Sequence, residues 1–239
     1  MLNAVHYIPL LTTLLSAWFG THLFIRWRER PERAHHGWWA FGVWIYGLGT
    51  LAESMTTLYG WSPGVFRLWY VTGALLGGAP LAQGSVYFHF KRSTAHAMSA
   101  VLVPYLLVAT ALVVVSPIDL SLVTPHGLSG KVLAWKWVRM LSPIVNLYAV
   151  IFLIGGAVRS AIQHWNRPAT RAIAHGNAMI ALGAILPGIG GSFSRAGHTE
   201  VLYVLECIGL LCIWNGFHRC TSMERARVVI EVPAQHVAA

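Results

Sequence analysis

Apolar residues in this chain come in long runs that short polar stretches separate. A membrane-spanning helix needs about 17–25 mostly apolar residues, and seven runs fall near that length. They cover residues 4–25, 37–58, 64–90, 98–115, 138–158, 172–189 and 201–217. The pattern therefore predicts an all-α, polytopic membrane bundle of seven transmembrane helices over residues 1–218, followed by a short, disordered tail over residues 219–239.

The composition agrees with a membrane protein. The 239 residues are 56% hydrophobic and 10% charged, whereas a soluble domain carries about 25% charged residues. The formal net charge is +9, which in a soluble protein would suggest nucleic acid as a partner. Here all the basic residues except Arg67 and Arg139 lie between or after the predicted spans, where the positive-inside bias places them. We therefore expect the lipid bilayer, and not nucleic acid, as their partner.

The basic residues also predict how the chain crosses the membrane. Of the 17 Lys and Arg residues, twelve fall on the side that holds the C-terminus and five on the other side. The richer side is expected to be cytoplasmic. This places the N-terminus outside, the C-terminus in the cytoplasm and the chain in the cell (inner) membrane as a multi-pass protein.

Charged side chains inside spans are the strongest functional indicators, because each costs about 2.5–3.5 kcal/mol at the centre of a bilayer. Glu53 and Arg67 lie seven residues on either side of Gly60. A helical rise of about 1.5 Å per residue puts both charges about 10 Å from the turn at residues 60–63. Glu206 falls near the outer end of the last span. The three charges are therefore predicted to share the outer half of the bundle.

This depth predicts a pocket that opens to the outside and is lined by aromatic and polar side chains. Tyr46 shares a helical face with Glu53, and Arg139 can reach the same level with its long side chain. The predicted ligand-binding residues are Tyr46, Glu53, Arg67, Tyr70, Arg139, Asn146, Tyr203 and Glu206.

Two functions and one structural role fit this predicted site. A non-enzymatic sensor or binding module would hold a small or lipophilic ligand there. It would signal to a separate cytoplasmic protein through the loops at residues 26–36 and 159–171. An intramembrane enzyme acting on a lipid or isoprenoid would instead use Glu53 and Glu206 as acid and base. In the structural role, Glu53 and Arg67 pair only to fix the hairpin between their spans.

Histidines leave a third function open, a haem- or metal-binding subunit of an electron-transfer complex. Its candidate ligands lie near the cytoplasmic ends of the spans and are His22, His89, His175 and His218. No H-x-x-x-H pair lies within a span, and the sequence has no H-E-x-x-H. We therefore expect no metal ion and no cofactor.

The region 26–92 combines several features in a fixed order. A basic break after the first span is followed by Trp44, Gly47-Leu48-Gly49, Glu53, Arg67-Leu68-Trp69-Tyr70, and Tyr87-Phe88 before Lys91-Arg92. In these features and in topology the chain resembles the N-terminal seven-transmembrane module of bacterial sensor histidine kinases. The resemblance implies a receptor-like module. The stretch after Phe217 is too short for a kinase domain, so a separate protein would carry the output. Another bacterial seven-helix family is the alternative.

Overall fold

The structure is a computed structural model and describes residues 4–125 and 127–236. Every regular element in this part of the chain is helical, apart from two isolated β-bridges in the segment 116–140. The α-helices are α1 (Ile8–Glu29), α2 (Ala34–Tyr59), α3 (Pro63–Trp69), α4 (Ala79–His89), α5 (Arg92–Val115), α6 (Leu141–Ala149), α7 (Gly155–Trp165), α8 (Arg171–Arg195) and α9 (Thr199–His236). The shorter pieces are the 3₁₀ helices η1 (Ala4–Tyr7), η3 (Leu120–Leu122), η4 (Gly130–Val132), η5 (Lys136–Met140) and η7 (Pro168–Thr170) and the π-helical segments η2 (Tyr70–Leu75) and η6 (Val150–Ile154).

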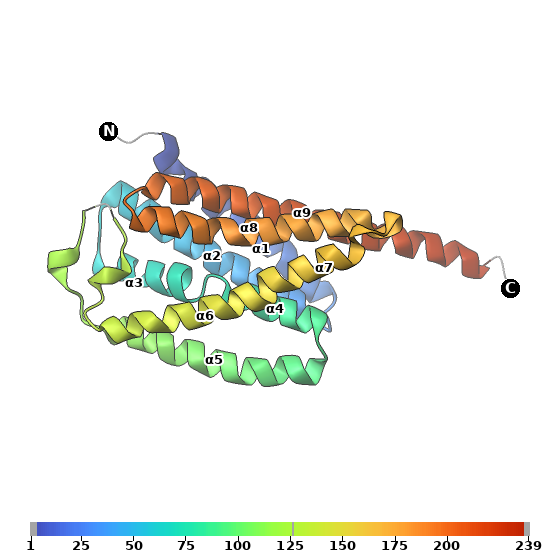
Figure 1. Cartoon of the computed structure of the whole chain (residues 1–239), viewed down its shortest axis with the longest axis horizontal. Helices are drawn as coiled ribbons and strands as arrows, with labels where there is room; N and C mark the ends of the chain where they lie inside the picture. The colour runs from blue at the N-terminus through green and yellow to red at the C-terminus, as the bar shows by residue number, and fades with distance from the viewer. Residues whose placement is uncertain (1–3, 126, 237–239) are drawn as a thin grey trace.

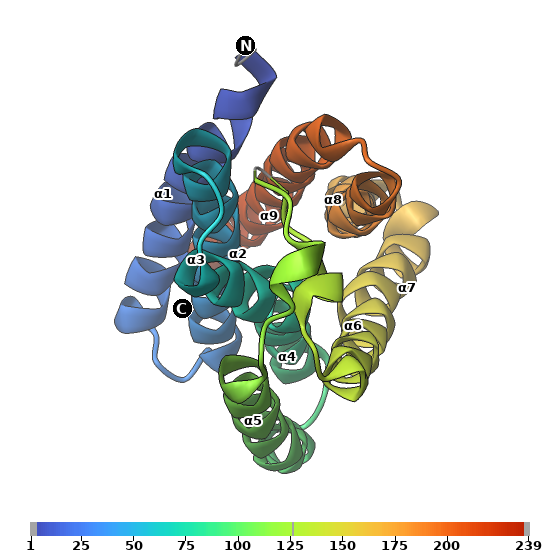
Figure 2. The ribbon, with the colours of Figure 1, turned by 90° about the vertical axis from the view of Figure 1, so that its left-hand side faces the viewer.

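Successive long helices run in opposite directions along the long axis of one bundle (Figure 1). Helices α1, α4, α7 and α9 run toward one end, where α2, α5 and α8 begin. We call it the basic end, because the Arg-rich loops lie there. The segment 116–140 covers the opposite end, which we call the loop end. Seen from the loop end, α1, α9, α8, the α6–α7 span and α5 lie around the outside, with α2 and the α3–α4 span between them (Figure 2).

Among the residues that the structure describes, six helical segments are long and apolar enough to cross a membrane, so the predicted all-α, multi-pass architecture is confirmed at that level. They are Ala4–Glu29, Pro63–His89, Arg92–Val115, Lys136–Trp165, Pro168–Arg195 and Thr199–Ser222. Helix α2, the predicted second span, is not among the six. It has 26 residues but packs against α1, α3 and α4, and its buried face carries polar side chains, which lower its hydropathy. These buried polar residues include Thr50, Glu53, Ser54, Thr56 and Thr57.

Helix α9 extends well past the predicted last span. Its 38 residues correspond to about 57 Å of helix, against a bilayer core of about 30 Å. Residues 219–236, predicted as a disordered tail, therefore form the last turns of α9, because an established helix adds one hydrogen bond for each further residue. The end of the predicted tail, residues 237–239, lies outside the described residues.

Helices α8 and α9 approach each other so closely that their backbones touch. A Cβ atom added to Gly183 would lie 2.4 Å from the carbonyl oxygen of Gly209, and one added to Gly216 would lie 2.4 Å from that of Gly176. The two contacts are seven residues, or about two turns, apart on each helix. Small residues at such spacing let membrane helices pack tightly through their backbones.

The third predicted span, residues 64–90, is broken and not one continuous helix. Helix α3 passes into η2, a turn follows at residues 76–78, and α4 begins at Ala79. A Cβ atom added to Gly78 would lie 2.7 Å from the Cβ atom of Ala149, the residue just before η6. The turn at residues 76–78 and the start of the π-helical segment η6 therefore meet inside the bundle. π-Helical segments within α-helices occur frequently at functional sites.

Gln83 of α4 is fully buried and joins three helices through its side chain. Its Nε2 atom donates hydrogen bonds to the carbonyl oxygen of Ala95 (3.1 Å) and to Oγ of Ser99 (2.8 Å), both in α5. Its Oε1 atom accepts a hydrogen bond from the hydroxyl group of Tyr148 in α6. This one amide fixes α4 against α5 and α6, between the turn at residues 76–78 and the basic end.

Replacing Gln83 with leucine is expected to lower the free energy of unfolding by about 2 kcal/mol, because the hydroxyl group of Tyr148 loses its acceptor in the protein interior. Thermal unfolding of the purified protein in detergent measures the change. Gln163, which is exposed on α7, is the matched control, and Gln163→Leu should unfold like the parent protein. Equal stability of both variants would contradict a structural role for the Gln83 amide.

Candidate functional site

Two carboxyl groups from distant parts of the sequence meet in the half of the bundle nearest the loop end. Glu53 of α2 is 3% exposed, and its carboxyl group is within hydrogen-bonding reach of that of Glu206 in α9. The Oε2 atom of each group is buried and has no hydrogen-bond donor among the described residues. A hydrogen bond between two carboxyl groups requires a proton on one of them. The pair can therefore hold one proton between its two members.

Aromatic and hydroxyl side chains surround the carboxyl pair. The indole Nε1 atom of Trp69 donates a hydrogen bond to Oε1 of Glu53 (3.0 Å). The hydroxyl group of Tyr46 donates to the backbone oxygen of Glu206 (2.9 Å), and a hydrogen bond of 2.8 Å joins the hydroxyl groups of Thr57 and Tyr203. We call these six residues, from α2, α3 and α9, the carboxyl cluster: Tyr46, Glu53, Thr57, Trp69, Tyr203 and Glu206.

Helical periodicity explains why α2 contributes half of the cluster. Tyr46, Glu53 and Thr57 are separated by seven and four residues, so they share one face of the helix. Gly49, on the same face, lets η2 come close: a Cβ atom there would lie 3.3 Å from the Cα atom of Gly73. This approach brings Trp69, which directly precedes η2, onto Glu53.

Half of the predicted ligand-binding residues lie in the cluster. These are Tyr46, Glu53, Tyr203 and Glu206. The predicted contact between Glu53 and Arg67 is wrong. The Nη2 atom of Arg67 donates a hydrogen bond to the carbonyl oxygen of Ser116, just past α5 (3.2 Å). Arg67 precedes Trp69 by two residues, or about 200° around the helix, so it points away from α2. Trp69, and not Arg67, links the two helices through Glu53.

The three other predicted residues also lie outside the cluster. The hydroxyl group of Tyr70 accepts a hydrogen bond from Ser142 of α6 (3.4 Å), and its ring packs in the apolar core at the loop end. Arg139 lies in η5, within the segment that covers the loop end. Asn146 is exposed on the surface of α6. The side chains of α6 and η5 therefore do not complete the predicted pocket.

Two cluster residues, Thr57 and Trp69, were not among the predicted ligand-binding residues. Thr57 follows Glu53 by one helical turn, and that spacing could have identified it. Gln83 was also missed, although an amide within an apolar span is itself a signal of an interior position. For Trp69 the sequence carries no such signal, because tryptophan is common at membrane interfaces in any case.

The candidate haem or metal ligands have separate local partners. His22 accepts a hydrogen bond from Arg26 (3.2 Å), His89 contacts the carbonyl oxygen of Ser85 (2.9 Å), and the ring of His175 lies against Trp165. His218 is exposed on α9. Within the described residues, no group of three or more His, Cys, Asp or Glu side chains is placed to hold a metal ion. The four histidines therefore do not belong to a metal site of that kind.

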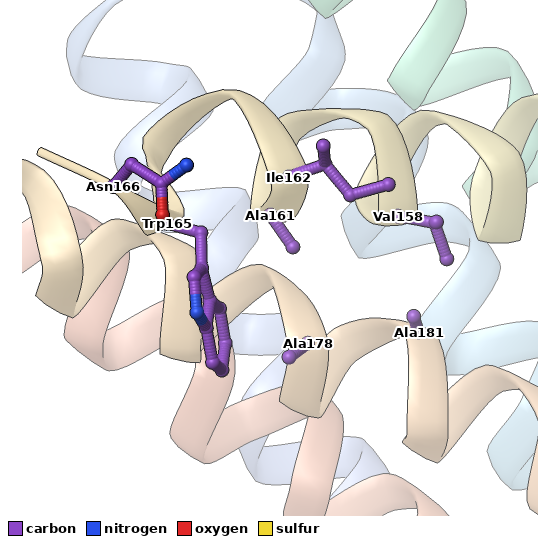
Figure 3. A pocket seen from close by; sticks show the side chains of 7 residues that line it. All are labelled: Val158, Ala161, Ile162, Trp165, Asn166, Ala178 and Ala181. Carbon is purple, nitrogen blue, oxygen red and sulfur yellow. The ribbon is translucent and has the colours of Figure 1, made fainter.

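A cavity of about 430 Å³ lies between α7 and α8 near the basic end, at the opposite end of the bundle from the predicted pocket. Figure 3 shows side chains of both helices facing it. Its lining consists of Val158, Ala161, Ile162, Trp165, Asn166, Ala178 and Ala181. The lining is apolar apart from Asn166 and the indole N–H of Trp165.

Comparison with known proteins finds no match for this chain among protein-family models, curated proteins or solved structures. The resemblance to the membrane module of sensor histidine kinases therefore stays a prediction. The functional interpretation depends on the geometry of the carboxyl cluster.

Proposed function

We propose that this protein is a membrane sensor or binding module and that the carboxyl cluster is its ligand site. In this proposal α2 spans the membrane as a seventh helix, with the N-terminus outside and the loop end facing outward. The observation that carries it is the contact between Glu53 and Glu206. Well-packed apolar side chains often stabilise an interior at least as well as buried ionisable groups do. A buried pair of acids is therefore better explained by a role in binding a ligand than by a contribution to the stability of the fold.

The chemistry of the cluster favours a small cationic or amine ligand. Its two Oε2 atoms are acceptors without a donor among the described residues, so they suit an ammonium group that would replace the shared proton. The rings of Tyr46, Trp69 and Tyr203 add electron-rich faces that attract cations. Because Glu53 is almost fully buried, binding requires a local opening of the bundle.

The break in the third span offers a route from the site to the basic end. Trp69 is held by Glu53 and directly precedes η2, so a ligand that engages Glu53 competes for that hydrogen bond. Release of Trp69 would let η2 change its hydrogen-bonding pattern and move α4. Helix α4 ends at the basic end, where a separate cytoplasmic protein would contact the loops at residues 26–36 and 159–171.

Conservative removal of either acid tests the proposal. Purified wild-type protein is titrated with a panel of primary and quaternary amines, such as spermidine and choline, and binding is followed by calorimetry. We expect at least one amine to bind, with an affinity roughly tenfold or more lower in Glu53→Gln and in Glu206→Gln, because each loses a buried charge-assisted contact. Both variants should stay folded, since a glutamine amide can still donate to the remaining carboxyl group.

Glu200→Gln is the matched control, because Glu200 is exposed in the first turn of α9 and outside the cluster. It should bind the amine like the wild type. Absence of binding by the whole panel, or equal binding by all variants, would rule out the cluster as a cation site. Loss of folding in both cluster variants, without a ligand effect, would assign the pair a purely architectural role.

An intramembrane enzyme is the second candidate, and the same contact favours it. Two carboxyl groups that hold one proton between them provide an acid and a base at one point. The enzyme would convert a lipid or isoprenoid that enters from the bilayer. Mass spectrometry of lipids incubated with the wild type and with the two glutamine variants distinguishes the candidates. Conversion by the wild type, lost in both variants, would replace the sensor with the enzyme.

A further inference from the structure

The cavity between α7 and α8 has the size of a ligand site and lies on the outer surface of the bundle. Its volume of about 430 Å³ falls within the range of about 300–1,000 Å³ that is typical of small-molecule sites. Ile162 is 69% exposed and Val158 is 41% exposed, so the cavity opens outward from the bundle. In a membrane this opening faces lipid chains.

Two arginines, Arg167 and Arg171, flank the end of this cavity, an open groove between the two helices, that lies nearest the basic end. A third, Arg159, lies between Val158 and Ile162 of the lining, at the other end of the groove, because α7 runs toward the basic end. Arg167 follows Asn166 directly. On α8, Arg171 precedes Ala178 by seven residues, so it lies on the groove-facing side about 10 Å nearer the basic end.

These three arginines have no carboxylate near them in the hairpin. The stretch 155–195 holds four arginines and no Asp or Glu. Arg159, Arg167 and Arg171 are exposed, and no side-chain hydrogen bond or ion pair joins them to another described residue. An anion at the mouth of the groove would therefore meet positive charge that the described side chains leave unneutralised.

We propose that the groove between α7 and α8 binds a phospholipid with an anionic head group. One acyl chain lies along the apolar lining between the two helices, and the head-group phosphate meets Arg167 and Arg171. Trp165 and Asn166 lie at the level where chain and head group join, a depth at which tryptophan is favoured. Basic pockets between membrane helices recognise anionic head groups in this way. The proposal is independent of the role of the carboxyl cluster.

Native mass spectrometry of the delipidated protein tests this site. The protein is titrated with phosphatidylglycerol and with phosphatidylcholine of the same chain length. We expect one phosphatidylglycerol to bind at least tenfold more tightly than phosphatidylcholine. The double variant Arg167→Gln, Arg171→Gln should weaken phosphatidylglycerol binding roughly 30-fold, from the usual gain per basic residue near anionic lipid. Its binding of phosphatidylcholine should not change.

Two further variants separate the groove from general charge attraction. Ala178→Trp fills the groove from an exposed position without changing charge, and it should remove the tight phosphatidylglycerol site. The double variant Arg28→Gln, Arg30→Gln makes the same charge change at the same end, at the end of α1, and should retain the site. Equal binding of the two lipids, an equal loss in both double variants, or unchanged binding by Ala178→Trp would each overturn the proposal in favour of ordinary surrounding lipid.

Discussion

Replacing Gly183 with valine is expected to lower the free energy of unfolding by about 3 kcal/mol, near the upper end for overpacking in a tight interior. The new Cβ atom would lie 2.4 Å from the carbonyl oxygen of Gly209 and 2.8 Å from Cγ1 of Ile213. The first of these is a backbone atom, which cannot swing aside as a flexible side chain can. The two helices must therefore separate, and the second contact, between Gly176 and Gly216, is weakened with the first.

Gly188 provides the matched control on the same helix. A Cβ atom at Gly188 would have no heavy atom within 4 Å, so Gly188→Val should unfold like the wild type or slightly later, because valine is a better helix former than glycine. Unfolding in detergent with increasing SDS measures both variants. The same loss of stability at positions 183 and 188 would show that the backbone contact between α8 and α9 does not matter.

Replacing Glu206 alone with leucine is expected to cost about 2–3 kcal/mol, because Glu53 then keeps a buried carboxyl group without its partner. The double variant Glu53→Leu, Glu206→Leu should recover at least about 1 kcal/mol of that loss, since removing both polar partners is often nearly neutral. The same SDS unfolding assay on the two single variants and the double variant gives the coupling energy.

Exposed Glu200 again provides the control. Glu200→Leu should change stability by less than about 0.5 kcal/mol, as surface substitutions usually do. Strictly additive effects of the two cluster substitutions would mean that the carboxyl groups do not touch. Leucine removes the hydrogen bond of the pair, whereas glutamine preserves it, so this cycle measures the contact itself and the glutamine variants measure binding.

The helices and the interior acids could be predicted from the sequence because both follow from the cost of exposing polar groups to lipid. Apolar runs predict the helices, and the cost of an intramembrane charge predicts that Glu53 and Glu206 lie inside the bundle. The structure brings these two side chains together from α2 and α9. The spacing of Tyr46 and Glu53 was sufficient to place them on one face, because the periodicity of a regular helix fixes direction as well as depth.

The predicted partner of Glu53 was wrong because residue counting gives depth along a helix and not rotation about it. Arg67 and Trp69 differ by only about 3 Å in depth but by about 200° in direction. The direction of α3 relative to α2 depends on packing at Gly49 and Gly73. That packing is a tertiary contact that one helix's sequence does not encode.

The breaks at η2 and η6 could not be predicted for a different reason. A π-helical turn has almost the same composition as the α-helix around it, because only the hydrogen-bonding pattern differs. The apolar run over residues 64–90 therefore predicts one helix where the structure has α3, η2 and α4. The extension of α9 past the membrane-length segment was missed because a polar stretch after a span can either fray or continue as helix.

The π-helical segment η2 also determines where the third span can change length. A π turn holds one residue more than an α turn, so loss of one residue between positions 70 and 75 would convert η2 into ordinary α-helix and leave both flanks in register. The same deletion within α4 would rotate one side of the helix by about 100° against the other and separate Gln83 from its partners. A single-residue deletion in this span is thus expected to be tolerated better in η2, beside the acids, than within α4.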